Sequence, residues 1–339
     1  MNRTSKDVCL LCGFKPSTKK NSHWVPAAML KSMVGKRYNE ESYQFSSFQK
    51  RKLDVYYGRD NLKNTDTTIK QNHYSLDYIF CDDCENKLGV LESAVIPVIQ
   101  NEIRLERKRP NYKEELGEDG ITLKKCLRLN NNIFRLFIYS IVWRFSLIHQ
   151  LEDNIQLISK DLQEDLRLIL NESLSLDLKE IIENDSIHSL VFQVFTADSF
   201  DDGTEGTVYS EEIHKDPALF FVNEFIILFY GNEYTITGEY YFPIERMIQS
   251  VDVLNSKDDH PKIGFISNAS FNELINRIFG DGAKVILTSL TNSVASCTGL
   301  SFIESRYHLY KLGMDIHQKT GSNIIQSFEE AAELICSNN

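Results

Sequence analysis

Apolar residues along the chain follow two different spacings, and the spacing changes near residue 188. Before that point, the stretches 84–109, 121–148 and 159–174 have apolar residues at helical intervals, which predicts helices, the first bent or broken at Pro97. After it, short apolar or alternating runs rich in β-branched and aromatic residues predict strands. The pattern as a whole predicts a mixed α+β fold.

Individual segments are predicted from the same signals. Residues 43–58 predict a strand or hairpin, and Ser159 is a candidate helix N-cap. Near the C-terminus, a helix is expected to end at Gly280 and to be followed by a strand at 283–290 and by two further helices. The other predicted strands are 74–81, 189–197, 218–231 and 233–244.

The most apolar run, residues 133–148, is short for a bilayer span and contains Arg135 and Arg144. It therefore predicts a buried helix and not a membrane helix. The N-terminus lacks the apolar core of a signal peptide. We expect a soluble, cytoplasmic protein with no membrane contact.

The length of 339 residues is large for one hydrophobic core and favours two domains. Residues 109–120 are polar and marked by Gly and Pro, which is typical of a linker. We therefore expect a small N-terminal module, residues 1–108, joined to a larger mixed α+β body, residues 121–339.

The net charge of −11 is distributed unevenly. Residues 1–70 contain 14 Lys or Arg and 6 Asp or Glu, a net charge of +8, so the remaining 269 residues carry −19. This asymmetry is typical of a module that faces nucleic acid, whereas the acidic body would repel DNA. A solvated basic surface explains the charge equally well.

Four of the seven cysteines stand in two Cys-x-x-Cys pairs, Cys9 with Cys12 and Cys81 with Cys84. In a chain without an export signal, this spacing indicates zinc before disulfides. Four thiolates make a closed structural zinc site that leaves no position open for catalysis. The other cysteines are isolated, at positions 126, 297 and 336.

His23 follows the first pair and precedes Trp-Val-Pro. Cys-x-x-Cys, a His before a hydrophobic residue and Pro, and a second Cys-x-x-Cys that opens a helix resemble the zinc-stapled HNH, or ββα-metal, endonucleases. The match covers about the first 95 residues. In that family the His is the general base for the water that attacks a phosphodiester, and one divalent metal stabilises the leaving oxygen.

The resemblance implies that His23 is the general base and that Glu85 binds a catalytic Mg²⁺ or Mn²⁺, held weakly. Ser22 stands where the family usually has Asp, and Glu85 where it has Asn or His. Either the carboxylate that binds the metal stands on the helix here instead of on the strand, or Ser22 marks a degenerate site that is poor in metal ligands. Asn86 would fix the geometry or contact a phosphate.

A narrower resemblance reaches about residue 150. The stretches "SHWVPAAML", "FCDDCENKLGVLE" and "FIYSIVWRFSL" are similar to a group of uncharacterised bacterial HNH-like proteins, in which Ser22 is part of the pattern. HNH modules joined to an unrelated body often act in restriction, mobile elements or phage defence. The resemblance therefore implies a role of this kind, including antiviral defence.

Further candidates surround the second cysteine pair. His73 fits a second active-site His, but a solvated strand-edge His fits better; Asp77 lies near the middle Asn of some HNH proteins. Glu92 fits a cap or an ion pair better than a ligand. Residues 50–52, Lys-Arg-Lys among aromatics, suit phosphate contact and base stacking, or an ordinary hairpin with its own small core.

The sequence therefore favours a metal-dependent HNH-like DNA endonuclease with a structural zinc, whose acidic body binds a protein partner or a small-ligand regulator. One alternative is a non-catalytic zinc-knuckle module that binds nucleic acid or protein. Another is a body that is itself an enzyme or a ligand sensor. Convergence of His23 and Glu85 favours the nuclease; a Glu85 that points to solvent or is tied in a salt bridge favours binding.

Overall fold

The structure is a computed structural model, and it describes residues 3–26, 28–29, 43–46, 52–55, 75–116, 121–152, 154–184, 187, 190–197, 207–215, 217–231, 259–320 and 324–337. Helices and a mixed sheet make up the described chain, which confirms the predicted α+β class. The chain divides into two compact units. The first contains residues 1–42 and 55–271, and the second contains residues 43–54 and 272–339.

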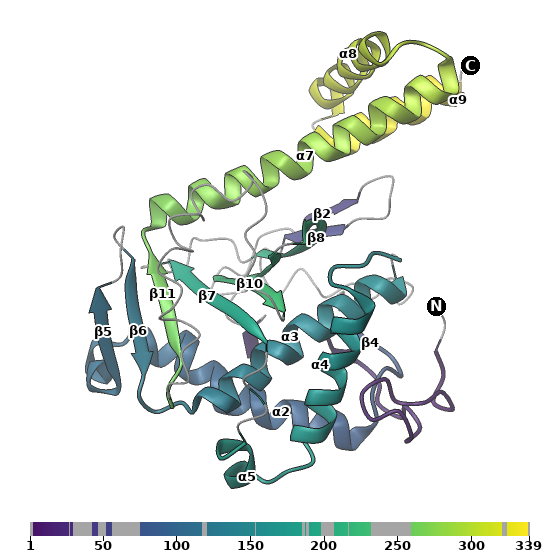
Figure 1. Cartoon of the computed structure of the whole chain (residues 1–339). Helices are drawn as coiled ribbons and strands as arrows, with labels where there is room; N and C mark the ends of the chain where they lie inside the picture. The colour runs from purple at the N-terminus through teal and green to yellow at the C-terminus, as the bar shows by residue number, and fades with distance from the viewer. Residues whose placement is uncertain are drawn as a thin grey trace. The chain divides into compact units, whose positions relative to one another are not determined.

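The first unit contains a sheet in the order β8-β9-β10-β7-β11-β6-β5 (Figure 1). Neighbouring strands are antiparallel, except that β11 pairs parallel with β7. The predicted strands at 189–197 and 218–231 are confirmed, and 233–244 lies outside the described residues. The strands are β5 (Tyr112–Leu116), β6 (Thr122–Cys126), β7 (Val191–Ala197), β8 (Thr207–Lys215), β9 (Ala218–Asn223), β10 (Phe225–Gly231) and β11 (Lys262–Ile266).

The helices of this unit begin and end at recognisable signals. α2 (Asp82–Ile96) continues at Pro97 into one wide π-helical turn, as the predicted break requires. The backbone N–H of Leu162 donates to Ser159 Oγ (3.2 Å) at the start of α4 (Lys160–Ser173), so the predicted N-cap is confirmed. The remaining helices are α3 (Asn131–Glu152), α5 (Leu178–Ile182) and the 3₁₀ turns Glu102–Arg104 and Glu106–Asn111.

α3 is the centre of the first unit, and residues 131–149 are all buried. On one side, Tyr139 lies edge-on to Phe229 of β10; on the other, Trp143 stacks on Phe80 beside the second cysteine pair. One hydrophobic core therefore runs from the cysteine segments through α3 to the sheet. This packing does not test whether residues 1–108 and 121–339 have separate functions, so that division stays a prediction.

Two predictions near the linker are wrong. Residues 112–116 form the edge strand β5, and residues 122–126 form its partner β6, so the helix predicted from 121 begins only at Asn131. Charged side chains are common on edge strands, where they discourage pairing with other chains. The Glu115 carboxylate pairs with Lys113 (3.2 Å) and Lys262 (3.1 Å), and this charge made a strand resemble a linker.

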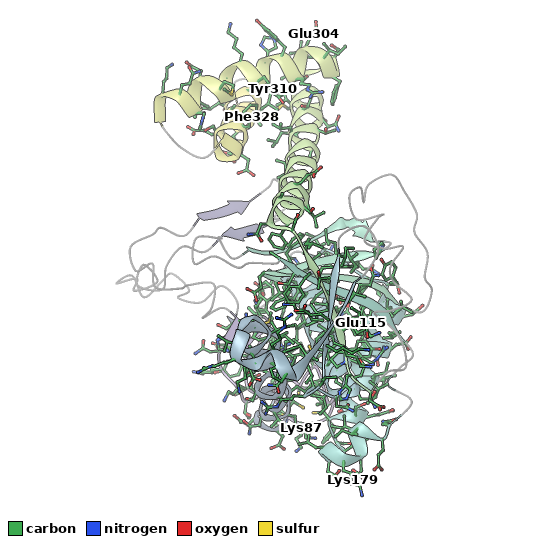
Figure 2. The ribbon with its side chains drawn as sticks, turned by 90° about the vertical axis from the view of Figure 1, so that its left-hand side faces the viewer. Lys87, Glu115, Lys179, Glu304, Tyr310 and Phe328 are labelled. Atoms are coloured by element: carbon green, nitrogen blue, oxygen red, sulfur yellow. A yellow bond between two sulfur atoms is a disulfide. The ribbon has the colours of Figure 1, made fainter. Side chains whose placement is uncertain are left out.

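The second unit is built from helices and a short hairpin. It contains β2 (Tyr43–Ser46), β3 (Lys52–Val55), most of α7 (Asn268–Thr298), α8 (Phe302–Thr320) and α9 (Ile324–Ser337). The predicted hairpin and the last two helices are confirmed. Tyr310 and Phe328 lie edge to face between α8 and α9, with ring centroids 5.0 Å apart (Figure 2).

The predicted helix end at Gly280 and the strand at 283–290 are wrong, because α7 runs through both without a break. Leu290 and Val294 lie one helical turn apart and both face the core of the second unit. A short apolar run does not reveal its period, which explains the error.

Among the residues that the structure describes, no individual helix is both long and apolar enough to cross a bilayer. The bent pair of Ile286–Thr298 and Phe302–Lys319 reaches that length and composition only when its two parts are taken together.

Candidate metal centre and active site

The first cysteine pair lies on a tight turn. The N–H of Cys9 donates to the Lys15 carbonyl (2.7 Å), and the N–H of Gly13 donates back to the Cys9 carbonyl (2.9 Å). Gly13 has φ +76°, a left-handed conformation that glycine adopts at no steric cost. The turn brings Cys9 and Cys12 around to the same side of the loop.

The second pair is positioned by α2. Cys81 directly precedes the helix and Cys84 lies in its first turn. Asp82 accepts from Thr18 Oγ1 (2.6 Å), and Asp83 forms an ion pair with Lys15, so the helix start is tied to the first turn. The backbone bonds between the two segments run from Leu10 to Ile79 (2.9 Å) and from Lys19 to Phe80 (3.1 Å).

The four sulfur atoms of Cys9, Cys12, Cys81 and Cys84 lie within 4.8 Å of one another, and none is in a disulfide. A hydrogen bond with Cys84 lowers the pKa of Cys9 to about 4, and the same contact, with burial, raises the pKa of Cys84. Four thiolates gathered this closely, three of them from buried cysteines, repel one another, and a cation would compensate their charge. The donor set fits a structural zinc ion, as predicted.

His23 is held in a two-residue strand, β1 (Ser22–His23), which pairs with β4 (Ser75–Leu76). Its side chain is half-buried. The residues after it anchor the strand, because Trp24 is buried edge-on to Phe145 of α3, with ring centroids 4.9 Å apart. The hydrophobic residue that follows the histidine in the motif therefore fixes β1 against α3.

Glu85 lies in the first turn of α2, with its carboxylate toward β1. Glu85 Oε2 and Ser22 Oγ are both buried, and neither has a hydrogen-bond partner among the described residues. Burial raises the pKa of Glu85, while the charge of Arg144 and the closeness of the Ser22 side chain and the His23 backbone favour its ionised form. Among the described residues Glu85 forms no ion pair, and it lies close to the Ser22 side chain and the His23 backbone. Convergence of the His23 imidazole and Glu85 on one metal stays a prediction.

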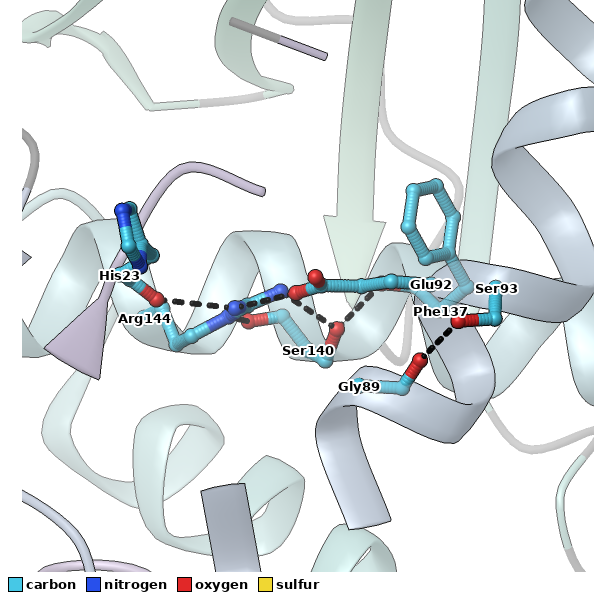
Figure 3. A network of polar contacts seen from close by, with 7 residues as sticks. All are labelled: His23, Gly89, Glu92, Ser93, Phe137, Ser140 and Arg144. Carbon is cyan, nitrogen blue, oxygen red and sulfur yellow. Dashed lines mark hydrogen bonds and ion pairs between the residues drawn. The ribbon is translucent and has the colours of Figure 1, made fainter. Parts of the chain in front are cut away.

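Arg144 of α3 joins the pieces of this site, and sequence reasoning gave it no role. Figure 3 shows its guanidinium between β1 and α2. Nη1 donates to the His23 carbonyl (3.0 Å) and to Glu92 Oε1 (2.8 Å), and Nε and Nη2 donate to Ser140 of the same helix. The ion-pair interpretation of Glu92 is thereby confirmed. The signal was an arginine inside an apolar helix, which requires a partner.

The other candidates have no established role. Asn86 is exposed on α2. Asp77 is exposed and accepts the backbone N–H of Asn21 (2.9 Å), which stabilises a turn. His73 and residues 50–51 lie outside the described residues, and only the backbone of Lys52 is described.

No family model matches the chain, and no curated protein or solved structure is significantly similar to it.

Proposed function

We propose that the protein is a metal-dependent HNH-like endonuclease that hydrolyses DNA phosphodiester bonds. The observation that carries this proposal is the arrangement of Ser22, His23 and Glu85 beside the cysteine cluster, with two buried oxygens that no described residue satisfies. β1 pairs with β4, and α2 follows β4 along the chain, as in a ββα-metal module, although β2 and β3 stand between the two paired strands in sequence.

In this proposal each residue has one role. His23 accepts the proton of the water that attacks the phosphodiester, and its backbone carbonyl is held by Arg144. Glu85 Oε2, with Ser22 Oγ as a weaker donor, would hold Mg²⁺ or Mn²⁺, which when bound supplies positive charge at the leaving oxygen. Asn86 is exposed one residue further along the helix, where it can contact a phosphate.

The charge distribution supports a nucleic-acid substrate. The first 70 residues carry a net charge of +8 and the remainder −19, so we assign DNA contact to the N-terminal module. In this proposal the acidic body binds a protein partner or a small-ligand regulator, and the protein acts in the cytoplasm, in phage defence or restriction.

A non-catalytic zinc-knuckle binding module is the second candidate. The observation in its favour is the complete burial of Ser22, which makes its hydroxyl a poor ligand for a catalytic cation that binds substrate phosphate. Such a module would bind DNA with the same basic surface and leave it intact.

Cleavage of supercoiled plasmid in Mg²⁺ or Mn²⁺ tests the proposal. We expect the wild type to nick or linearise the plasmid, and His23→Ala and Glu85→Gln each to lose on the order of 10²–10⁴-fold in rate with zinc retained. Asp161→Asn is the control, because Asp161 is an exposed carboxylate in the first turn of another helix, α4. Intact plasmid with every metal, together with a gel shift, would establish the binding module instead.

A further inference from the structure

Arg144 is an arginine with almost no solvent contact. Its side chain is 2% exposed, and a charge so deeply buried is costly unless it is paired and hydrogen-bonded. The pairing here is extensive, because Nε, Nη1 and Nη2 all donate hydrogen bonds of 2.8–3.2 Å (Figure 3). The guanidinium is therefore fixed in one orientation.

The partners of Arg144 belong to three elements that are far apart in sequence. His23 lies 121 residues before it and Glu92 lies 52 residues before it, while Ser140 is one turn away in α3. Glu92 stands two turns after Glu85 on α2. A fixed Glu92 side chain therefore fixes the rotation of α2 about its own axis. It also fixes the position of the first turn of α2 relative to β1.

The contact with His23 goes through the backbone carbonyl and not through the imidazole. It therefore sets where the strand lies. A planar guanidinium can serve a carbonyl and a carboxylate at the same time, whereas an ammonium group lacks that fixed fork.

We infer that Arg144 is a positioning residue, which holds His23 and the start of α2 at the separation the site requires. The inference rests on the proposed function. It also means that α3, the central helix of the fold, sets the geometry of the N-terminal site, so that the body is part of the catalytic apparatus and not only an attachment to it.

Arg135 offers a matched control on the same helix. Its side chain is also buried, at 1% exposure, and it donates to the Leu190 carbonyl (3.2 Å) and Tyr139 Oη (3.4 Å) on the sheet side. None of these partners belongs to the site. Arg135→Met therefore removes a buried arginine of equal size without touching β1 or α2.

The experiment compares Arg144→Met, Arg144→Lys and Arg135→Met in the full-length protein. Zinc content and thermal melting report folding, plasmid cleavage reports kcat and KM, and ¹³Cε1 histidine NMR reports the titration of His23, assigned with His23→Gln. Displacement by about 1 Å at an active site costs on the order of 10²-fold in rate. We expect Arg144→Met to keep zinc, to lose about 10²-fold in kcat with little change in KM, and to shift the His23 titration.

Arg144→Lys should recover part of the lost rate, because it keeps the charge and one or two donors. Arg135→Met should melt earlier but retain the wild-type kcat and His23 titration. Wild-type cleavage by zinc-loaded Arg144→Met, or an equal loss of kcat in Arg135→Met, would show that Arg144 is merely structural.

Two outcomes need a further test, the first with another variant and the second with another measurement. If Arg144→Met loses zinc, Glu92→Gln replaces it, because the amide removes the ion pair with Nη1 and leaves only a weaker neutral acceptor. We expect a loss of about tenfold in kcat, and an unchanged kcat would overturn the inference. If the wild type cuts no DNA, the nuclease proposal fails, and the NMR titration still tests positioning: a His23 signal that does not change in Arg144→Met contradicts it.

Discussion

Two regions of this protein bring cysteines together, and the chemistry differs between them. In the first unit, four free thiols cluster within 4.8 Å. In the second unit, Cys297 at the end of α7 and Cys336 of α9 form a disulfide across 39 residues, with a Cα–Cα distance of 5.6 Å. The sequence spacing revealed the first set and gave no sign of the second.

The packing around each set explains the difference. The C-terminal helices have a core of their own, which includes Leu290, Leu309 and Phe328, so their disulfide adds to a fold that packing already specifies. The cysteine segments have two strands of two residues each and a tight turn. These segments join the core of the first unit with little regular structure of their own, so we expect a bound metal to contribute more to stability in this region than the disulfide does in the other.

Removal of zinc should have the largest effect. Binding of a structural zinc contributes on the order of 10 kcal/mol to the folding of a small domain, so Cys84→Ser should release the metal and unfold residues 3–26. Elemental analysis, the near-ultraviolet signal of the buried Trp24 and limited proteolysis would report this. Cys126→Ser, a buried thiol outside the cluster, should keep its zinc. A Cys84→Ser protein that melts like the wild type would contradict the comparison.

Loss of the disulfide should have a smaller effect, confined to the second unit. Closing a loop of this length stabilises a fold by about 4 kcal/mol in the chain-entropy account. Cys297→Ser should therefore lower the melting temperature of the C-terminal helices and leave zinc content unchanged. Thiol titration of the denatured, unreduced, zinc-free protein should find five free thiols; seven would show that the disulfide does not form.

Ser22→Asp should make the thermal stability of the first unit depend more strongly on a divalent metal. A second carboxylate beside Glu85 should destabilise the metal-free protein by roughly 2 kcal/mol, because like charges repel in a buried site. Mn²⁺ should then raise its melting temperature by more than it raises that of the wild type, and cleavage should be kept or increased. Ser75→Asp is the control, since Ser75 is buried opposite His23 on β4. An equal Mn²⁺ response in both variants would contradict a site at Glu85.

The two regions should also respond to pH in opposite directions, which is the smallest effect. Burial, with Glu333 nearby, raises the pKa of Glu329 in α9 to about 7 from the usual 4.5. The folded state then binds more protons between these values, so the C-terminal helices lose stability as pH rises from about 4.5 to 7. The cysteine cluster loses zinc as pH falls.

The carboxyl group of Glu329 is partly solvated, so we expect about 1 kcal/mol after allowing for screening. Hydrogen exchange in α9 at pH 5 and pH 8 would measure it. Glu329→Gln should abolish the pH dependence; persistence of the trend in that variant would assign it to another group.

Features that depend on neighbours in sequence were predictable here, and features that depend on distant partners were not. The Cys-x-x-Cys pairs, the Ser159 cap and the break at Pro97 are local, and each was found. The approach of Glu85 to Ser22 came from the resemblance, since no pattern of spacing connects residues 63 apart.

The errors have the same origin. β5 is a strand because it pairs with β6. Its charged side chains form ion pairs, one of them with β11. The composition of this segment alone therefore resembles a linker. The run from 283 to 290 is helical because α8 and α9 offer a core on one face. The bond from Arg144 to His23 spans 121 residues, and nothing near either residue encodes it.

The distance in sequence between Arg144 and the cysteines has a consequence for the newly made chain. The ribosome releases the N-terminus first, so all four sulfur ligands are exposed once residue 84 has emerged, well before α3 exists. A nascent chain of that length can take up zinc but lacks the arginine that holds the histidine strand. One edge of β6 can pair with β5 at once, but its other edge waits longer still, because β11 begins at Lys262. During synthesis all four cysteines of the cluster are therefore available before the central helix arrives to hold the histidine strand.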